Sequence, residues 1–307
     1  MQYLSYAVSK HPEIRHQTGE GMIEFKDIWY TSEDGLSLYA RDYRCDSDSS
    51  LTVLCMHGLT RNSADFEDLA PALTDLARVV SVDQRGRGRS EWDSNSANYT
   101  PGTYVGDMFS LIEHLKLENI VLVGTSMGGL MSILMVTMKP DLFRGVVLND
   151  IGPVVNQEGL DRIKGYVGKG KPVKTWEEAV EQTRETNKVA FPAYTDEDWN
   201  KWVHRMYKEN EQGELKLRYD PAIAEPMAED DSNAAPADLW PLFDNMTNLP
   251  LLTIRGALSD ILAEDCVQEM QQRHAGMKLF EAAGVGHAPQ LDEPGVVDSV
   301  RTFLSAI

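Results

Sequence analysis

The chain has 307 residues, 42% hydrophobic and 25% charged, which is the composition of an ordinary soluble globular protein. Its formal net charge of −19 would repel nucleic acid and anionic membranes, so we expect neither as a partner. Three cysteines without a C-x-x-C pair indicate no disulfide framework and fit a reducing compartment. Residues 1–21 carry charges and lack the apolar core of a secretory signal, so we expect a cytoplasmic protein.

Short apolar runs bounded by turn residues predict eight strands along the chain. They cover residues 24–33, 36–44, 52–56, 78–82, 120–123, 143–148, 251–254 and 277–281. Helical spacing of apolar residues predicts helices over residues 61–76, 104–117, 129–138, 263–273 and 296–307. Because strands and helices alternate, we expect an α/β fold with a mostly parallel eight-stranded sheet and helices on both faces.

The alternation stops between about residues 152 and 240, where the sequence is rich in charge and in aromatic residues. Periodicity over 176–189 and 196–207 predicts amphipathic helices there. We therefore expect a core domain of residues 1–151 and 241–307, with residues 152–240 inserted after the sixth strand as a helical cap over the strand ends. Trp199, Trp202 and Met206 share one face of such a helix, and some of the cap's aromatic residues would line a pocket.

Residues Gly124–Gly128 read G-x-S-x-G between an apolar strand and an apolar helix that ends before Pro140. In this strand–turn–helix context, the turn lifts the hydroxyl of Ser126 clear of the sheet. The N-terminal amides of the following helix would face any negative charge that forms beside this hydroxyl. The pattern predicts a nucleophilic serine.

A serine hydroxyl is a poor nucleophile near neutral pH, so it needs a general base and a group that orients the base. In this architecture the acid and the histidine follow the serine along the chain, in loops after later strands. Asp260 follows the strand at 251–254 and His287 follows the strand at 277–281. We therefore predict a triad of Ser126, Asp260 and His287. Asp150, after the sixth strand, is the alternative acid. Our interpretation favours Asp260 and expects Asp150 to cap the turn that leads into the insertion.

Five ordered motifs, spanning about residues 24–307, resemble the α/β-hydrolase fold superfamily of the type with a helical cap. They are His57-Gly58-Leu59-Thr60, Asp83-Gln84-Arg85-Gly86-Arg87-Gly88-Arg89-Ser90, Gly124–Gly129, Gly256–Asp260 and Gly286-His287. The resemblance implies that His287 is the base and that Asp260 orients it. It also implies an oxyanion hole made by the backbone amides of Leu59 and Met127.

Residues near these motifs have more modest expected roles. His57 would hold the oxyanion loop rather than react, and residues 85–90 would form a turn packed beneath the site, without the pattern of a phosphate-binding loop. Arg61, Asn62 and Ser63 follow the oxyanion loop and would border the site. No H-E-x-x-H or clustered metal-ligand pattern occurs in the sequence, so we expect neither metal nor cofactor.

The serine at position 126 argues against relatives of this fold that need an aspartate nucleophile, such as haloalkane dehalogenases and epoxide hydrolases. The expected function is therefore a carboxylic-ester hydrolase for small to medium acyl chains, with a small-molecule ester as substrate. One alternative is a hydrolase that cleaves carbon–carbon bonds of meta-cleavage products or β-diketones with the same triad. A more remote alternative is a non-catalytic, ligand-binding member of the fold.

Overall fold

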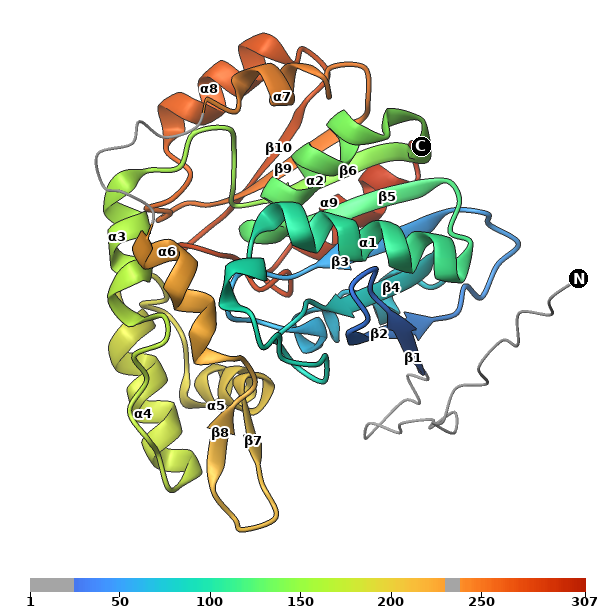
Figure 1. Cartoon of the computed structure of the whole chain (residues 1–307). Helices are drawn as coiled ribbons and strands as arrows, with labels where there is room; N and C mark the ends of the chain where they lie inside the picture. The colour runs from blue at the N-terminus through green and yellow to red at the C-terminus, as the bar shows by residue number, and fades with distance from the viewer. Residues whose placement is uncertain (1–24, 230–237) are drawn as a thin grey trace, which may run out of the picture.

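A computed structural model describes residues 25–229 and 238–307 (Figure 1). The expectation for residues 1–21, the predicted first residue of the first strand and part of the predicted cap lie outside the described residues.

The described chain contains an eight-stranded mixed sheet, and the predicted α/β class is confirmed. Its strands are β1 (Phe25–Thr31), β2 (Ser37–Tyr43), β3 (Thr52–Met56), β4 (Arg78–Asp83), β5 (Ile120–Thr125), β6 (Phe143–Asn149), β9 (Leu251–Gly256) and β10 (Lys278–Ala282). Their spatial order is β1-β2-β4-β3-β5-β6-β9-β10. β2 pairs antiparallel with β1 and β4, whereas the remaining pairs are parallel. The carboxyl ends of β3, β5, β6, β9 and β10 therefore meet at one edge of the sheet.

The central strands consist mainly of buried apolar residues because helices cover both faces of the sheet. Alternate residues point to opposite sides: Leu54 and Leu122 enter one hydrophobic core, whereas Val53 and Val121 enter the other. The first core contains residues of α1 (Pro101–Leu115), α2 (Met127–Met138), α7 (Trp240–Asp244) and α8 (Glu264–Arg273). The second contains residues of α9 (Val296–Leu304). The prediction of two covered faces is confirmed.

The segment predicted as one helix over residues 61–76 is instead two short 3-10 helices, η1 (Ser63–Phe66) and η2 (Pro71–Leu73). Pro71 supplies no backbone N–H and its ring excludes the preceding turn of an α-helix, so a continuous helix cannot pass this position. The apolar spacing that suggested a helix is real, because Phe66, Leu69 and Leu73 are all buried. Further 3-10 turns are η3 (Ser96–Asn98) and η4 (Pro140–Leu142).

Between β6 and β9 the chain forms helices to one side of the sheet, at the left of Figure 1. They are α3 (Gln157–Tyr166), α4 (Trp176–Asn187), α5 (Asp196–Met206), η5 (Pro221–Ala224) and α6 (Glu225–Glu229). Both predicted amphipathic helices are present, as α4 and α5. A small hairpin, β7 (Tyr207–Glu209) and β8 (Leu215–Leu217), was missed because three-residue strands give almost no alternation to read. The division into a core and a cap at residues 152–240 stays a prediction.

The uncharged stretch over residues 119–138 forms β5, a sharp turn and α2. Among the described helices, none combines the length and the apolar run that a membrane crossing requires.

Candidate active site

The sharp turn between β5 and α2 places Ser126 in a strained conformation, with φ 51° and ψ −114°. Such a backbone is costly for a residue with a side chain and is typical of functional sites. The flanking glycines make the turn possible. A Cβ at Gly124 would lie 2.3 Å from the carbonyl oxygen of Gly128, and one at Gly128 would lie 2.1 Å from that of Met56. The spacing of the G-x-S-x-G pattern thus follows from backbone crowding.

Ser126, His287 and Asp150 form one continuous series of hydrogen bonds. The Nε2 of His287 lies 2.8 Å from the Oγ of Ser126, and its Nδ1 lies 2.9 Å from Oδ2 of Asp150. A carboxylate can only accept, so Nδ1 carries the proton and Nε2 offers its lone pair to the serine hydroxyl. The side chain of Asp150 is 0% exposed and that of His287 is 8% exposed. This arrangement can remove a proton from Ser126.

The carboxylate of Asp150 is fixed from several sides. Asp150 follows β6, and its own N–H donates to the carbonyl of Ile254 at 2.7 Å. The N–H of Gly256 donates to Oδ1 at 2.8 Å, and the hydroxyl of Ser259 donates to Oδ2 at 2.7 Å. Together with His287, three donors from the ends of neighbouring strands hold this carboxylate in one orientation.

The assignment of Asp260 as the partner of His287 is corrected by these contacts. Asp260 instead pairs with Arg162 of α3, with 2.5 Å from Nε to Oδ2 and 2.8 Å from Nη2 to Oδ1. Burial alone would raise the pKa of Asp260, but the hydrogen bond and charge of Arg162 outweigh it and hold that pKa below its ordinary value. The loop after β9 does approach the site, but through Ser259, one residue earlier, whose hydroxyl reaches Asp150.

The loop after β3 lies beside the nucleophile. A Cβ built on Gly58 would be 3.7 Å from the Cβ of Ser126. The next residue, Leu59, and Met127, the first residue of α2, have backbone N–H groups with no acceptor among the described residues. These are the two amides expected to form the oxyanion hole. The fully buried Arg87 holds this loop by donating from Nε to the carbonyl of Leu59 at 2.8 Å.

His57 is fully buried and holds the loop after β3 through hydrogen bonds to backbone groups, without contacting the reacting atoms. Its Nδ1 lies 2.7 Å from the carbonyl of Gly58, and its Nε2 accepts from the N–H of Gln84 at 3.0 Å. Both ring nitrogens are satisfied only when the ring is neutral, with its proton on Nδ1. Burial accordingly lowers the pKa of His57 to about 4.

This buried histidine predicts a specific loss of stability in acid. The pKa of His57 is about 4 in the folded chain and about 6.5 when unfolded. Below about pH 6.5 the imidazole of His57 therefore binds a proton in the unfolded state but stays neutral in the folded state. We expect this one group to remove about 2 kcal/mol of unfolding free energy between about pH 7.5 and pH 5. Urea unfolding curves of the wild type and His57→Gln should show it as a shallower pH dependence in the variant; parallel profiles would contradict it.

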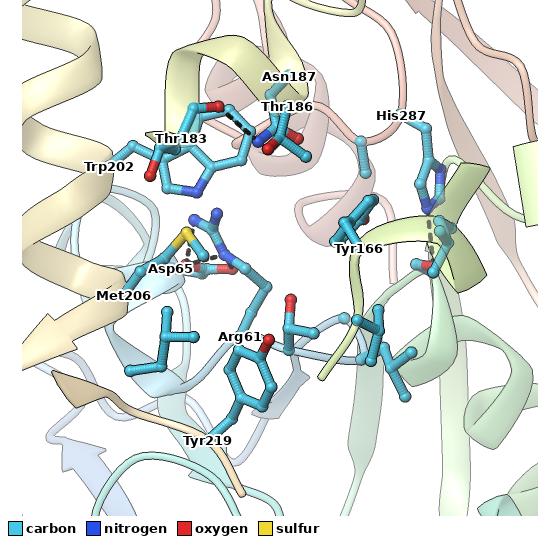
Figure 2. A pocket seen from close by; sticks show the side chains of 18 of the residues that line it. Arg61, Asp65, Tyr166, Thr183, Thr186, Asn187, Trp202, Met206, Tyr219 and His287 are labelled. Atoms are coloured by element: carbon cyan, nitrogen blue, oxygen red, sulfur yellow. Dashed lines mark hydrogen bonds and ion pairs between the residues drawn. The ribbon is translucent and has the colours of Figure 1, made fainter. Parts of the chain in front are cut away.

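A cavity of about 320 Å³ opens over Ser126 and His287 (Figure 2). Its other walls come from the oxyanion loop, from α3, α4 and α5, and from the loop after His287. Arg61 lines it as expected, but Asn62 and Ser63 do not: both are buried, and the amide of Asn62 donates to the carbonyl of Arg205.

The aromatic face of α5 divides between cavity and core. Trp202 and Met206 line the cavity, whereas Trp199 lies behind Trp202, with their rings stacked 5.6 Å apart. Sequence spacing could not separate the two tryptophans, because both are buried on the same helix face. Among the described residues, no cluster of three His, Cys, Asp or Glu side chains is placed to hold a metal ion.

The fold agrees with comparisons to known proteins. Residues 53–299 match the Alpha/beta hydrolase family, and the chain belongs to that family. A solved α/β hydrolase from Novosphingobium aromaticivorans is 38% identical and superposes with a TM-score of 0.88, covering 94% of this chain and 100% of that one.

Two functionally described relatives align over 85% of this chain and 90% of their own lengths. One is a 3-hydroxybutyrate-oligomer hydrolase from Cupriavidus necator, 35% identical over 266 residues. The other is a 2-(acetamidomethylene)succinate hydrolase from Mesorhizobium japonicum, 27% identical over 262 residues. Hydrolysis is thus the reaction class common to the family and to both relatives.

Proposed function

We propose that this protein hydrolyses carboxylic esters of small to medium acyl chains through an acyl-enzyme intermediate on Ser126. The observation that carries the proposal is the hydrogen-bonded series from Ser126 through His287 to Asp150 at the base of a cavity. The cavity volume of about 320 Å³ supports a small substrate, since it lies at the lower end of the range for ligand sites. Asp150 takes the orienting role that sequence reading favoured for Asp260.

In the proposed reaction, the Oγ of Ser126 attacks the ester carbonyl while Nε2 of His287 accepts its proton. The carboxylate of Asp150 stabilises the resulting imidazolium through Nδ1–H. Negative charge develops on the former carbonyl oxygen, which accepts hydrogen bonds from the backbone N–H groups of Leu59 and Met127. Losing one such donor costs roughly 3–4 kcal/mol of transition-state stabilisation.

Collapse of the tetrahedral intermediate breaks the ester C–O bond, and His287 returns the proton to the leaving alkoxide. The product alcohol leaves, and Ser126 keeps the acyl group. Water then repeats the sequence, with His287 again accepting a proton, and releases the acid with the serine restored.

The relative that acts on 3-hydroxybutyrate oligomers supports an ester substrate built from a hydroxy acid. Short oligoesters of this kind are therefore the first natural substrates to test. The carbon–carbon hydrolase alternative uses the same three side chains, so only substrate choice separates it from the ester hydrolase.

The test is a panel of 4-nitrophenyl esters from acetate to decanoate, together with a β-diketone, assayed on the wild-type protein. We expect turnover of the short esters, decline with the longest acyl chains, and labelling of Ser126 by a fluorophosphonate. Turnover of the diketone alone would replace the proposal with carbon–carbon cleavage. A folded protein that turns over neither and resists labelling would be a non-catalytic member of the fold.

A further inference from the structure

We propose that Arg61 and Trp202 form a carboxylate subsite, so that the substrate is an ester that retains one free carboxylate. This inference rests on the proposed ester hydrolysis and goes beyond it, because it names a chemical group that the substrate must carry and the residues that receive it.

The first observation is a buried N–H group of Arg61 that has no acceptor. Arg61 is 8% exposed and lines the cavity. Its Nε and Nη2 donate to Asp65 at 2.7–3.0 Å, and Nη2 also donates to Gln290 at 2.8 Å. Its Nη1 is buried and has no partner among the described residues. An unsatisfied buried donor destabilises the folded state, so native structures keep few of them, and each needs an explanation.

The second observation is another orphaned donor in the same corner. Trp202 is 7% exposed and also lines the cavity, and its buried indole Nε1–H finds no acceptor in the part of the chain that the structure describes. The guanidinium carbon of Arg61 lies 4.6 Å from the centre of the Trp202 ring. Both side chains therefore carry N–H groups in one region where residues 25–229 and 238–307 supply no further acceptor. Each of these donors requires an oxygen acceptor, which a carboxylate in this part of the cavity would supply.

The charges around the cavity favour an anionic oxygen over a neutral one. Among the lining residues the cations are Arg61, Lys169 and Lys171, and the carboxylates are Asp65 and Glu185. Cations thus outnumber carboxylates here, although the whole chain has a net charge of −19. Asp65 balances the single charge of Arg61 and occupies its Nε–Nη2 edge, so the site for a second carboxylate is the remaining Nη1 group, with Lys169 and Lys171 as the further cations of the lining.

The subsite lies away from the reacting serine. Figure 2 shows His287 at one end of the cavity and the Arg61–Trp202 pair at the other, with Tyr166 between them. The carboxylate must therefore be separated from the scissile carbonyl by several bonds, in either the acyl or the alcohol part of the ester. A short oligoester of a hydroxy acid with a free terminal acid has this form.

The test compares substrates that differ only in that charge. One pair is the linear dimer of 3-hydroxybutyrate and its terminal primary amide; the other is monoethyl adipate and its primary amide. Each pair keeps the same scissile ester. For the wild type, we expect kcat/KM, followed by chromatography of the products, to favour the acid by about tenfold to a hundredfold in at least one pair.

In Arg61→Met, we expect the ratio of acid to amide to fall to within about threefold of one, because the cation and its unpaired Nη1 donor are gone. Trp202→Phe keeps the aromatic cover but removes the indole N–H, and should reduce the ratio by about three- to tenfold. Arg301→Met is the matched control: this arginine of α9 pairs with Asp75 and does not line the cavity, so the ratio should not change.

Loss of Arg61 leaves Asp65 without its ion-pair partner, which can destabilise the fold. The double variant Arg61→Met/Asp65→Asn removes this unpaired charge, and melting curves of both variants show whether they are folded. A wild type that hydrolyses 4-nitrophenyl butyrate but treats acid and amide alike would overturn the subsite alone. A wild type without ester turnover and without phosphonate labelling would instead overturn the proposed function.

Discussion

Replacing Ser126 with alanine is expected to lower kcat for 4-nitrophenyl butyrate by about a millionfold, leaving only slow hydrolysis aided by binding and the oxyanion hole. The substitution removes one oxygen atom, the atom 2.8 Å from Nε2 of His287. Without it no acyl-enzyme can form, and His287 has no proton to remove. The measurement is steady-state turnover at high protein concentration, with fluorophosphonate labelling followed by mass spectrometry.

Ser305→Ala is a suitable control for this experiment. Ser305 lies at the end of α9 and its hydroxyl bonds to the carbonyl of Arg301, away from the cavity. This variant should keep wild-type turnover and labelling. If Ser126→Ala retained more than about one hundredth of the activity, while its melting temperature stayed that of the wild type, another nucleophile would have to carry the reaction.

Replacing Asp150 with asparagine is expected to lower kcat by about ten-thousandfold, whereas Asp260→Asn should stay within about tenfold of the wild type. Asparagine fits the space of Asp150 but can turn an N–H toward Nδ1 of His287. The proton of the ring would then move to Nε2, where it blocks acceptance of the proton of Ser126. Asp260 has no such contact, because its carboxylate binds Arg162 of α3.

Both variants are compared by kcat at a pH where the wild type is most active, and by urea unfolding. The side chain of Asp260 is 34% exposed, so loss of its ion pair should change the unfolding free energy by no more than about 1 kcal/mol. If Asp260→Asn proved the more damaging of the two, the hydrogen bond between His287 and Asp150 would not be the one used in the reaction.

The fold could be predicted from the sequence wherever interactions within a short segment determine the structure. Buried strands such as β3 and β5 are short, largely apolar runs that end in, or are followed by, glycine and polar residues. The nucleophile turn was readable for the same reason, since Gly124 and Gly128 are the only residue type that its crowded backbone accepts. The failure at residues 61–76 is also local: apolar spacing was given more weight than Pro71.

The cap side of the site was much less readable. Trp199 and Trp202 are three residues apart on α5 and both are buried, yet only Trp202 lines the cavity. The orphaned N–H of Arg61 left no trace in the sequence. It depends on where Asp65, Gln290 and Trp202 lie around one guanidinium, and Gln290 is 229 residues away along the chain.

The residues of this chain were sufficient to indicate an α/β sheet, a reactive serine at residue 126 and a histidine at residue 287, because each depends on a short segment. The choice between Asp150 and Asp260 required the folded chain. Both follow parallel strands and both could point toward the same edge of the sheet. The contact between His287 and Asp150 joins residues 137 positions apart. The parallel register of β6 against β9 and the turn after each strand determine which carboxylate meets the imidazole.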